Sequence, residues 1–388
     1  MENRTSAVLP AFAGRNPGID LLRGVAIILV VIHHLALRIP LAKTGLADYV
    51  PLLVLKALSW DGGKAVKLFF VISGFLITDH TLRRWGSLGS MQARPFMVRR
   101  FCRLMPCLLV LLAVLSVFKL AGLPDFQFHH PEQSLSRAVF SVFFMHLNLY
   151  ETVTGYLPPN WDVLWSLSVE EVFYTAFPLV CLVLARWPSV LGIVFACLAL
   201  ALPYAEWLIR DAKDIWQDEA YGPGLCSIAM GVCAALLAHK FPLSARSRTA
   251  QCMGVLGSIG VGLYLLDGHS VSSVLGYYCA PLFYTLSCAA LLLAFQAGWG
   301  CAAVMRLPAW PRRWGQMSYE IYLSHMFIVM PAVHGFKATG QNWQLGWVWF
   351  FPVLLGAYYL GLAVERFLSR PADKALQRVF RLRQGAPV

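Results

Sequence analysis

An arginine and two histidines lie within an otherwise apolar run, "RGVAIILVVIHH", that begins at Arg23 and ends at His34. Eleven residues separate Arg23 from His34, which in an α-helix is three turns plus about 20°. Both side chains would therefore share one helix face, roughly 16 Å apart along the axis, whereas His33 would point about 100° away. Asp20 lies one turn before Arg23 and could pair with it. The stretch predicts either a polar path into a membrane or an interfacial arginine with a hydrogen-bonded core histidine.

A second cluster of basic residues lies in "RPFMVRRFCRLMP" and in the segment just before it. It contains arginines and no lysine, and the guanidinium fork suits phosphate oxygens. A requirement for positive charge on the cytoplasmic side explains several of these residues without any ligand. Six in one loop favour a phosphate-rich cytoplasmic ligand: Arg83, Arg84, Arg94, Arg99, Arg100 and Arg103.

The stretch "WSLSVEEVFY" carries two pairs of serine and glutamate. Ser168 and Glu171 have the spacing of a capping box, which would make them structural. Ser166 and Glu170 are spaced i, i+4, and Glu170 would lie one turn into a membrane helix. A carboxylate there could orient His34 and stabilise its charged form. Whether Glu170 or Glu171 is the active carboxylate stays open, since the helix boundary is uncertain by a few residues.

Two further apolar stretches contain polar side chains. In "MSYEIYLSHMF", His325 falls in the middle of a predicted span, one turn after Tyr322, and as an isolated residue it fits a satisfied core position. In "LFFVISGFLIT", Ser73 and Gly74 are small enough to let a second helix approach closely. Of these residues, Tyr322, His325 and Ser73 are secondary site candidates.

Composition defines the class of protein that must position these groups. Of 388 residues, 58% are hydrophobic and 13% are charged, and the mean hydropathy is +0.61. Soluble domains carry about 25% charged residues, so this chain is a polytopic membrane protein. The net charge of +12 is then a matter of membrane sidedness, and no nucleic-acid partner is expected. The ten cysteines show no CxxC and no zinc-type spacing, so we expect packing roles and no metal.

Apolar runs predict about ten transmembrane helices in an all-α fold, with a short re-entrant or interfacial helix near 137–150. "AFAG" precedes the first run, so no signal peptide is expected to be cleaved there. The predicted spans are 24–41, 64–80, 104–122, 165–185, 189–208, 222–239, 250–266, 275–297, 316–335 and 346–364.

Charge distribution predicts that both termini are cytoplasmic. The segments on the side of the termini hold 22 of the 32 lysines and arginines, and the other side holds 10. We expect a cytoplasmic segment at 1–23, one transmembrane domain at 24–370 and a basic cytoplasmic tail at 371–388.

Six stretches, in order along the chain, resemble the signatures of acyltransferase family 3, whose members are integral-membrane acyltransferases. They are "DLLRGVAIILVVIHH", "FFVISGFLI", "RRFCRLMP", "WSLSVEEVFY", "SYEIYLSH" and "VERFLSRPADK". One such motif is weak evidence, but six in the family's order are specific, and they run through nearly the whole chain.

The resemblance implies transfer of an acyl group, commonly acetyl, from cytoplasmic acyl-CoA to a hydroxyl on an acceptor outside or within the membrane. Family acceptors are often sugars of surface polysaccharides, and some are small molecules. The expected location is the cytoplasmic (inner) membrane, with no permanently bound cofactor. Some members carry a fused esterase-like domain. The chain ends at Val388 without room for one, so we expect it to act alone or with a separate extracytoplasmic partner. The oligomeric state, acyl chain and acceptor stay open.

Combining the resemblance with helix geometry gives a mechanistic hypothesis. His34 would act as general base on the acceptor hydroxyl or would take the acyl group itself, with Glu170 orienting it and Ser166 beside it. The residues expected at the coenzyme phosphates are Arg23, Arg99, Arg100 and Arg103. Secondary candidates are Asp20, Ser73, Ser168, Glu171, Tyr322 and His325.

Two other classes of protein fit parts of the pattern. A multi-pass transporter of an anionic or sugar-like solute also needs polar residues at mid-membrane, but the sequence lacks an internal repeat and paired broken helices. A membrane scaffold could use the arginine loop to bind anionic lipids. Acyl-CoA consumption separates the enzyme from both.

Overall fold

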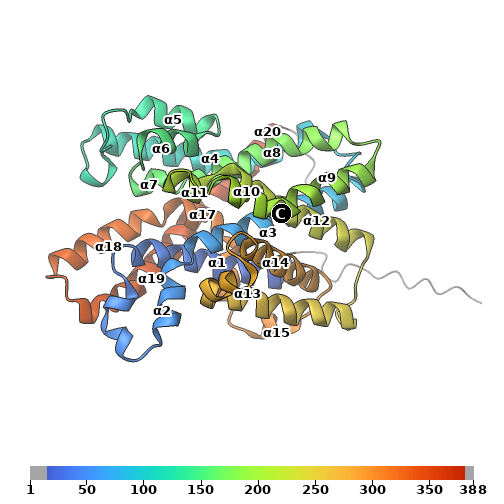
Figure 1. Ribbon diagram of the computed structural model, residues 1–388. Helices are drawn as coiled ribbons and strands as arrows, with labels where there is room; N and C mark the ends of the chain where they lie inside the picture. Colours follow the sequence, from blue (N-terminus) through green and yellow to red (C-terminus); the bar gives the residue numbers. More distant parts are fainter. Residues whose placement is uncertain (1–14, 381–388) are drawn as a thin grey trace, which may run out of the picture.

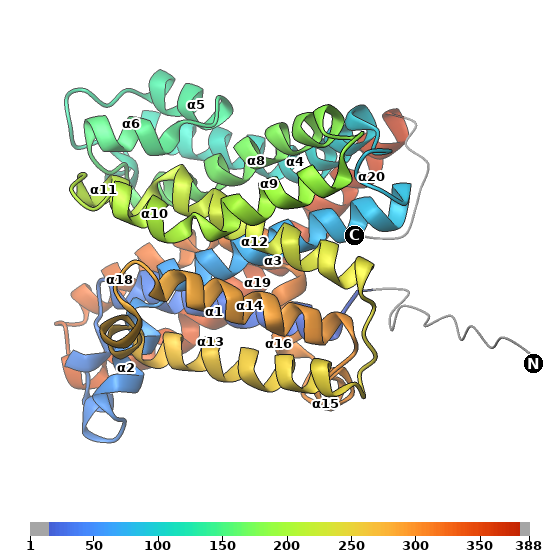
Figure 2. The same ribbon diagram turned by 45° about the vertical axis from the view of Figure 1, so that its right-hand side comes forward.

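A computed structural model describes residues 15–380, and within them the protein is entirely helical, with no β-strand. The longer helices lie side by side in a bundle, as Figures 1 and 2 show. In Figure 2 they run across the picture, with α5, α6 and α11 at the left-hand end and α20 at the right-hand end. The prediction of an all-α polytopic membrane protein is confirmed, whereas the sidedness of the termini stays a prediction.

Seven helical segments of the described chain are long and apolar enough to cross a membrane. Three of them join a long helix to short ones: Pro159–Val183, Asp214–Lys240 and Trp343–Val379. The helices are α1 (Pro17–Ala36), α3 (Gly62–Trp85), α4 (Ala93–Leu120), α7 (Pro159–Asp162) with α8 (Trp165–Val183), α11 (Asp214–Glu219) with α12 (Tyr221–Lys240), α13 (Arg248–Leu275), and α19 (Phe350–Val364) with η4 (Trp343–Trp349), η5 (Glu365–Ser369) and α20 (Arg370–Val379).

The remaining predicted spans are helical but bent, broken or short. Helices α9 (Pro188–Leu200) and α10 (Leu202–Leu208) bend by 46°, and they make an eighth crossing if they count as one. Helix α14 (Ala280–Gln296) has 17 residues. The predicted span 316–335 is divided between α17 (Ser318–Ser324) and α18 (Met326–Ala338), with His325 at the junction.

The other elements are short and connect the long helices. The predicted segment 137–150 is two helices, α5 (Leu135–Phe143) and α6 (Leu147–Thr154), separated at Met145, whose φ is 60°. A left-handed φ at a residue other than glycine interrupts a helix, which explains the division. The rest are η1 (Leu41–Lys43), η2 (Gly45–Asp48), α2 (Leu52–Trp60), η3 (Pro124–Phe126), α15 (Cys301–Arg306) and α16 (Trp310–Gln316).

The first helix begins at Pro17, well before its apolar run at residue 24. The Asn16 Oδ1 atom accepts hydrogen bonds from the backbone N–H of Gly18 at 2.9 Å and of Ile19 at 3.3 Å, which caps the helix. Proline at the first helical position favours the same start. The helix therefore starts seven residues before the predicted span, and Arg23 lies in its second turn, whereas the predicted membrane boundary at 23/24 stays a prediction. At the other end, α20 forms most of the described part of the predicted tail, and 381–388 lie outside the described residues.

Close backbone contacts between helices hold α1 and α3 in place. A methyl group on Gly74 of α3 would overlap the carbonyl oxygen of Ile228 on α12. A methyl group on Gly24 of α1 would overlap the carbonyl oxygen of Pro311 on α16. Small residues allow this approach between membrane helices. The predicted packing role of Gly74 is confirmed, and Ser73 beside it remains free to face a cavity.

Candidate active site

A cavity of about 460 Å³ lies between α1, α3, α4, α8 and α17. Its volume is in the range of small-molecule sites. Seven arginines line it against three carboxylates, so an anionic ligand is favoured there. We call it the arginine-lined cavity; its charged lining residues are Arg15, Arg23, Arg83, Arg84, Arg99, Arg100 and Arg103, with Asp20, Asp79 and Glu170.

Three of these arginines make no ion pair with a carboxylate of residues 15–380: Arg23, Arg84 and Arg100. Arg23 donates a hydrogen bond from Nη2 to the Ser318 hydroxyl at 2.9 Å. The Arg100 guanidinium lies 5.3 Å from the centre of the Tyr174 ring. These guanidiniums keep donors for a ligand, as predicted for Arg23 and Arg100. Arg84 was not singled out as a coenzyme contact, although its place in the arginine loop was a usable signal.

Arg103 is already engaged within the protein. Its Nη1 atom donates to Glu320 Oε1 at 2.8 Å and to the Ser369 hydroxyl at 2.7 Å, and the Ser369 hydroxyl donates to the same Glu320 oxygen at 2.6 Å. The Glu320 side chain is fully buried. An arginine that neutralises a buried carboxylate has a structural duty, so Arg103 lines the cavity with its Nη1 atom already engaged in an ion pair.

Asp20 does not pair with Arg23, which corrects the expectation from the sequence. Its Oδ1 atom accepts from Arg15 Nη2 at 3.2 Å, and its Oδ2 atom accepts from Gln316 at 3.2 Å. The spacing i, i+3 allowed the pair with Arg23, but Arg15 and α16 provide the closer donors. Asp20 therefore neutralises Arg15 and leaves Arg23 free.

The Glu170 carboxylate faces the cavity, within a hydrogen-bonded chain. Its Oε2 atom accepts from the Tyr174 hydroxyl at 2.7 Å, and the Ser73 hydroxyl lies 3.0 Å from the same Tyr174 oxygen. Since Tyr174 donates its one proton to Glu170, Ser73 donates to Tyr174. Ser73 also lines the cavity. Both candidates, Glu170 and Ser73, thus line the arginine-lined cavity.

Ser168 and Glu171 are buried and absent from the lining of the cavity. The capping box predicted for them is wrong, because α8 already begins at Trp165 and no side chain caps it. Both residues are inside the helix, more than half a turn past its start. Of the two adjacent carboxylates, only Glu170 reaches the cavity.

Tyr322 and Ser166 close the deep end of the cavity. The Tyr322 hydroxyl donates to the Val163 carbonyl at 2.8 Å and lies 2.7 Å from the Ser166 hydroxyl, which is its donor. Both side chains are buried and line the cavity. The ring of Tyr322 is 6.0 Å from that of His325, centre to centre. The far side of this wall therefore meets a histidine.

His325 is in contact with His34, and this contact was not anticipated from the sequence. The two rings are 4.9 Å apart, edge to face, and His325 Nε2 is 3.3 Å from His34 Nδ1. His325 Nδ1 faces the Tyr322 carbonyl at 2.7 Å and must carry a proton, which leaves Nε2 as an acceptor. His34 Nδ1 faces the Val30 carbonyl at 2.8 Å as well as this acceptor, so it is the protonated nitrogen.

This tautomer leaves His34 Nε2 with a lone pair, and that atom makes no hydrogen bond to any residue between 15 and 380. His34 is partly exposed and does not line the arginine-lined cavity. Its contact is with His325 and not with Glu170. His33, by contrast, is held through Nδ1 by the Ser59 carbonyl at 2.8 Å. A neutral imidazole with one oriented, unoccupied nitrogen can accept a proton.

Asp79 is a lining residue that sequence reasoning missed. It is buried on α3 and accepts from His239 at 3.0 Å, from Arg83 at 2.8 Å and from Gln296 at 3.2 Å. The spacing i, i+4 between Asp79 and Arg83 was a usable signal. The partners on α12 and α14 could not be read from the sequence.

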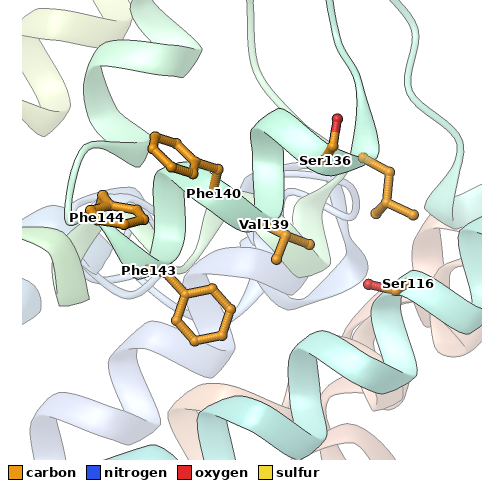
Figure 3. Close-up of a pocket in the computed structure, with 7 residues that line it drawn as sticks. Ser116, Ser136, Val139, Phe140, Phe143 and Phe144 are labelled. Atoms are coloured by element: carbon orange, nitrogen blue, oxygen red, sulfur yellow. The ribbon is translucent and has the colours of Figure 1, made fainter.

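A second hollow, of about 650 Å³, lies between α4 and α5 and is shown in Figure 3. Its lining is aromatic and aliphatic, with the hydroxyls of Ser116 and Ser136 as the only polar side chains. None of its lining residues is titratable. The charged side chains line the arginine-lined cavity instead.

Comparison with known proteins agrees with the resemblance in the motifs. A family model described as an acyltransferase domain matches residues 16–366. The peptidoglycan O-acetyltransferase of Listeria monocytogenes is 27% identical over 92% of this chain and 56% of its own length. Nodulation protein 10 of Rhizobium leguminosarum is 28% identical over 93% of this chain and 94% of its own length. A putative O-acetyltransferase of Staphylococcus aureus is 24% identical over 92% of this chain and 57% of its own. The chain thus spans little more than half the Listeria and Staphylococcus proteins. No solved structure matches.

Proposed function

The chain belongs to acyltransferase family 3, and from that premise we propose that it transfers an acetyl group from acetyl-CoA to a hydroxyl of a saccharide. The Listeria and Staphylococcus relatives are named as O-acetyltransferases, which supports O-acetyl transfer. The donor comes from the cytoplasm and the acceptor lies in or beyond the inner membrane. A separate extracytoplasmic partner remains part of the proposal.

The observation that carries the proposal is the arginine-lined cavity and its direction. Arg23 lines it, and His34 lies three turns further along the same uninterrupted helix, α1. Phosphates of the coenzyme bind at Arg23, Arg84 and Arg100, which form no ion pair with a carboxylate of residues 15–380 and keep donors for a ligand. The pantetheine arm extends past Glu170 toward the deep end. The geometry favours one long donor with an anionic head and a neutral tail.

Transfer needs the thioester to pass the wall formed by Ser166 and Tyr322, because His34 is beyond it. We propose that the arm takes over the hydrogen bond between these two hydroxyls. His34 Nε2 then accepts the proton of the acceptor hydroxyl, while the oxygen of that hydroxyl forms the ester bond to the acetyl carbon. The C–S bond breaks, and the thiolate receives the proton back from His34. Glu170 acts on the donor side through Tyr174, and His325 holds His34 in the required tautomer.

The experiment that tests the proposal follows labelled acetyl groups in membrane vesicles that contain the protein. Acetyl-CoA labelled in the acetyl group should lose its label to saccharide, and mass spectrometry of surface glycans should find one acetyl ester that is missing from cells without the protein. Uptake of a solute without consumption of acetyl-CoA would support the transporter instead. Neither transport nor consumption, with anionic lipid bound to the arginine loop, would support the scaffold.

Arg100 provides a prediction about the donor. Changing Arg100 to alanine should raise the KM for acetyl-CoA roughly 10- to 100-fold, because a charge-assisted hydrogen bond contributes about 1.5–3 kcal/mol. Arg100→Lys should raise the KM for acetyl-CoA less than Arg100→Ala does, since lysine keeps the charge but not the planar fork. Arg94→Ala is the matched control, because Arg94 is exposed on the same helix and does not line the cavity. Equal effects of the changes at 94 and 100 would contradict a phosphate site at Arg100.

A further inference from the structure

Three carboxylates from three different helices converge at the end of the bundle opposite α20. They belong to Glu151 of α6, Asp162 of α7 and Glu219 of α11, and one oxygen of each lies within 4.8 Å of the others. Figure 2 places α6 and α11 at the left-hand end and α20 at the right-hand end. The Glu151 side chain is fully buried, and Glu219 is 2% exposed. The acidic triad, as we call these residues, lies outside the arginine-lined cavity.

The acidic triad lacks the partners that buried carboxylates normally require. Each member has one oxygen without a hydrogen bond among residues 15–380: Glu151 Oε2, Asp162 Oδ1 and Glu219 Oε2. None forms an ion pair with a basic side chain of the described chain, although Arg38 lies close enough to Asp162 for an electrostatic interaction. Burying charge without compensation is costly, so something absent from the protein's own side chains must offset it.

A buried neutral side chain, Asn148, contacts the backbone of one member of the triad. Asn148 is fully buried and donates from Nδ2 to the Glu219 carbonyl at 2.6 Å. It lies three residues before Glu151 on α6, hence on the same helix face. Its Oδ1 atom has no hydrogen-bond partner among the described residues. The side chain is therefore held by its Nδ2 contact to Glu219, while its amide oxygen accepts no hydrogen bond from the described residues. This observation is independent of the carboxylates, and an amide oxygen has the chemistry of a cation ligand.

We propose that the acidic triad and Asn148 bind one hard divalent cation, Ca²⁺ or Mg²⁺. The donor set consists of oxygens alone, three anionic and one neutral, without a sulfur or an imidazole. Such a set suits hard cations and not zinc. The expectation that the protein has no metal rested on the absence of cysteines and histidines at metal-ligand spacing. Such a pattern does not detect a site whose carboxylates come from three separate elements.

The competing arrangement is a set of shared protons. Burial and the neighbouring Asp162 raise the pKa of Glu151 well above its usual value. Protonated carboxyls could bond to one another and hold the helices together. The two arrangements differ in whether a metal binds at all.

A cation here would stabilise the acceptor-side end of α1. Arg38 interacts electrostatically with Asp162 and donates from Nη1 to the His34 carbonyl at 2.8 Å. The metal would therefore change the charge environment of Arg38, a side chain that links the triad to His34. The inference itself is independent of the proposed function, because binding and stability report on it without any acetyl transfer.

The test uses the purified full-length protein in detergent, stripped with a chelator and then titrated separately with Ca²⁺, Mg²⁺ and Mn²⁺. We expect about one ion per chain by elemental analysis and a rise of the unfolding temperature that depends on ion concentration. Tb³⁺, a luminescent substitute for Ca²⁺, should show emission sensitised by tryptophan, because the buried Trp161 immediately precedes Asp162. No stoichiometric ion and no stabilisation by any of the three cations would overturn the proposal in favour of shared protons.

Variants locate the ion. Glu151→Gln and Asn148→Leu should each abolish the metal-dependent rise, whereas Glu132→Gln, an exposed change nearby in the chain, should leave it unchanged. The amide of glutamine can replace a shared proton, so Glu151→Gln should still fold if protons fill the site. If the variants do not fold, the titration of the unmodified protein decides. Retention of a full metal response by folded Glu151→Gln would place the ion elsewhere and contradict the assignment.

Discussion

Replacement of His34 by alanine is expected to lower the rate of acetyl transfer by about 10²- to 10⁴-fold, the range of a general base. The protein should still fold, because His34 bonds through Nδ1 only to its own helix and to His325. The measurement is the initial rate of labelled acetyl transfer in vesicles with equal amounts of protein. Binding of CoA should be unchanged, since His34 does not line the arginine-lined cavity.

His33 is the natural control for this loss. It neighbours His34 in the chain but is held by the Ser59 carbonyl, 2.8 Å away, so His33→Gln should keep most of the activity. His325→Gln should lower the rate less than His34→Ala, because it removes the orienting acceptor and leaves the base. Rapid quenching followed by peptide mass spectrometry separates direct transfer from an acetyl-histidine intermediate. A folded His34→Ala protein with full activity would contradict the mechanism.

Replacement of Arg103 by alanine is expected to destabilise the fold by about 3–5 kcal/mol, the cost of breaking a buried ion pair. Glu320 is fully buried, and without Arg103 the remaining hydrogen-bond partner of its carboxylate among residues 15–380 is Ser369. Thermal unfolding in detergent measures the effect. The double change Arg103→Met with Glu320→Gln should recover much of the stability, because it removes the charge together with its partner.

The outcome for Arg103 also decides between two roles for one residue. The sequence motif predicted a coenzyme ligand, and the ion pair with Glu320 predicts a structural role. If Arg103→Ala has a normal unfolding temperature and a raised KM for acetyl-CoA, Arg103 is a ligand of the coenzyme. Loss of stability that the double variant rescues would leave the phosphates to Arg23, Arg84 and Arg100.

Features within one helix were predictable from the sequence. The eleven-residue spacing of Arg23 and His34 needs only the pitch of a helix, and both lie on the continuous α1. The small residue Gly74 is at a close helix contact for the same local reason. The apolar runs located the helices, although their ends depend on caps such as Asn16, which hydropathy does not detect.

Contacts between distant segments were not predictable. His34 and His325 are 291 residues apart in the chain, and no spacing rule connects them. Asp20 was assigned to Arg23 because only local partners are visible in a sequence, whereas Gln316 arrives with α16. The acidic triad escaped notice in the same way, since each carboxylate looks like an ordinary polar residue near a helix end. A single sequence, taken without an alignment to its relatives, contains no signal for such pairings.

The most direct test of the account is an experimental structure of the protein with a thioether analogue of acetyl-CoA that cannot transfer its acetyl group. We predict phosphates at Arg23, Arg84 and Arg100, the arm along Glu170, and the Ser166–Tyr322 hydrogen bond replaced, with the acetyl carbonyl beside His34 Nε2. An analogue bound in the opposite direction, or outside the arginine-lined cavity, would contradict the proposed path from the arginines to His34.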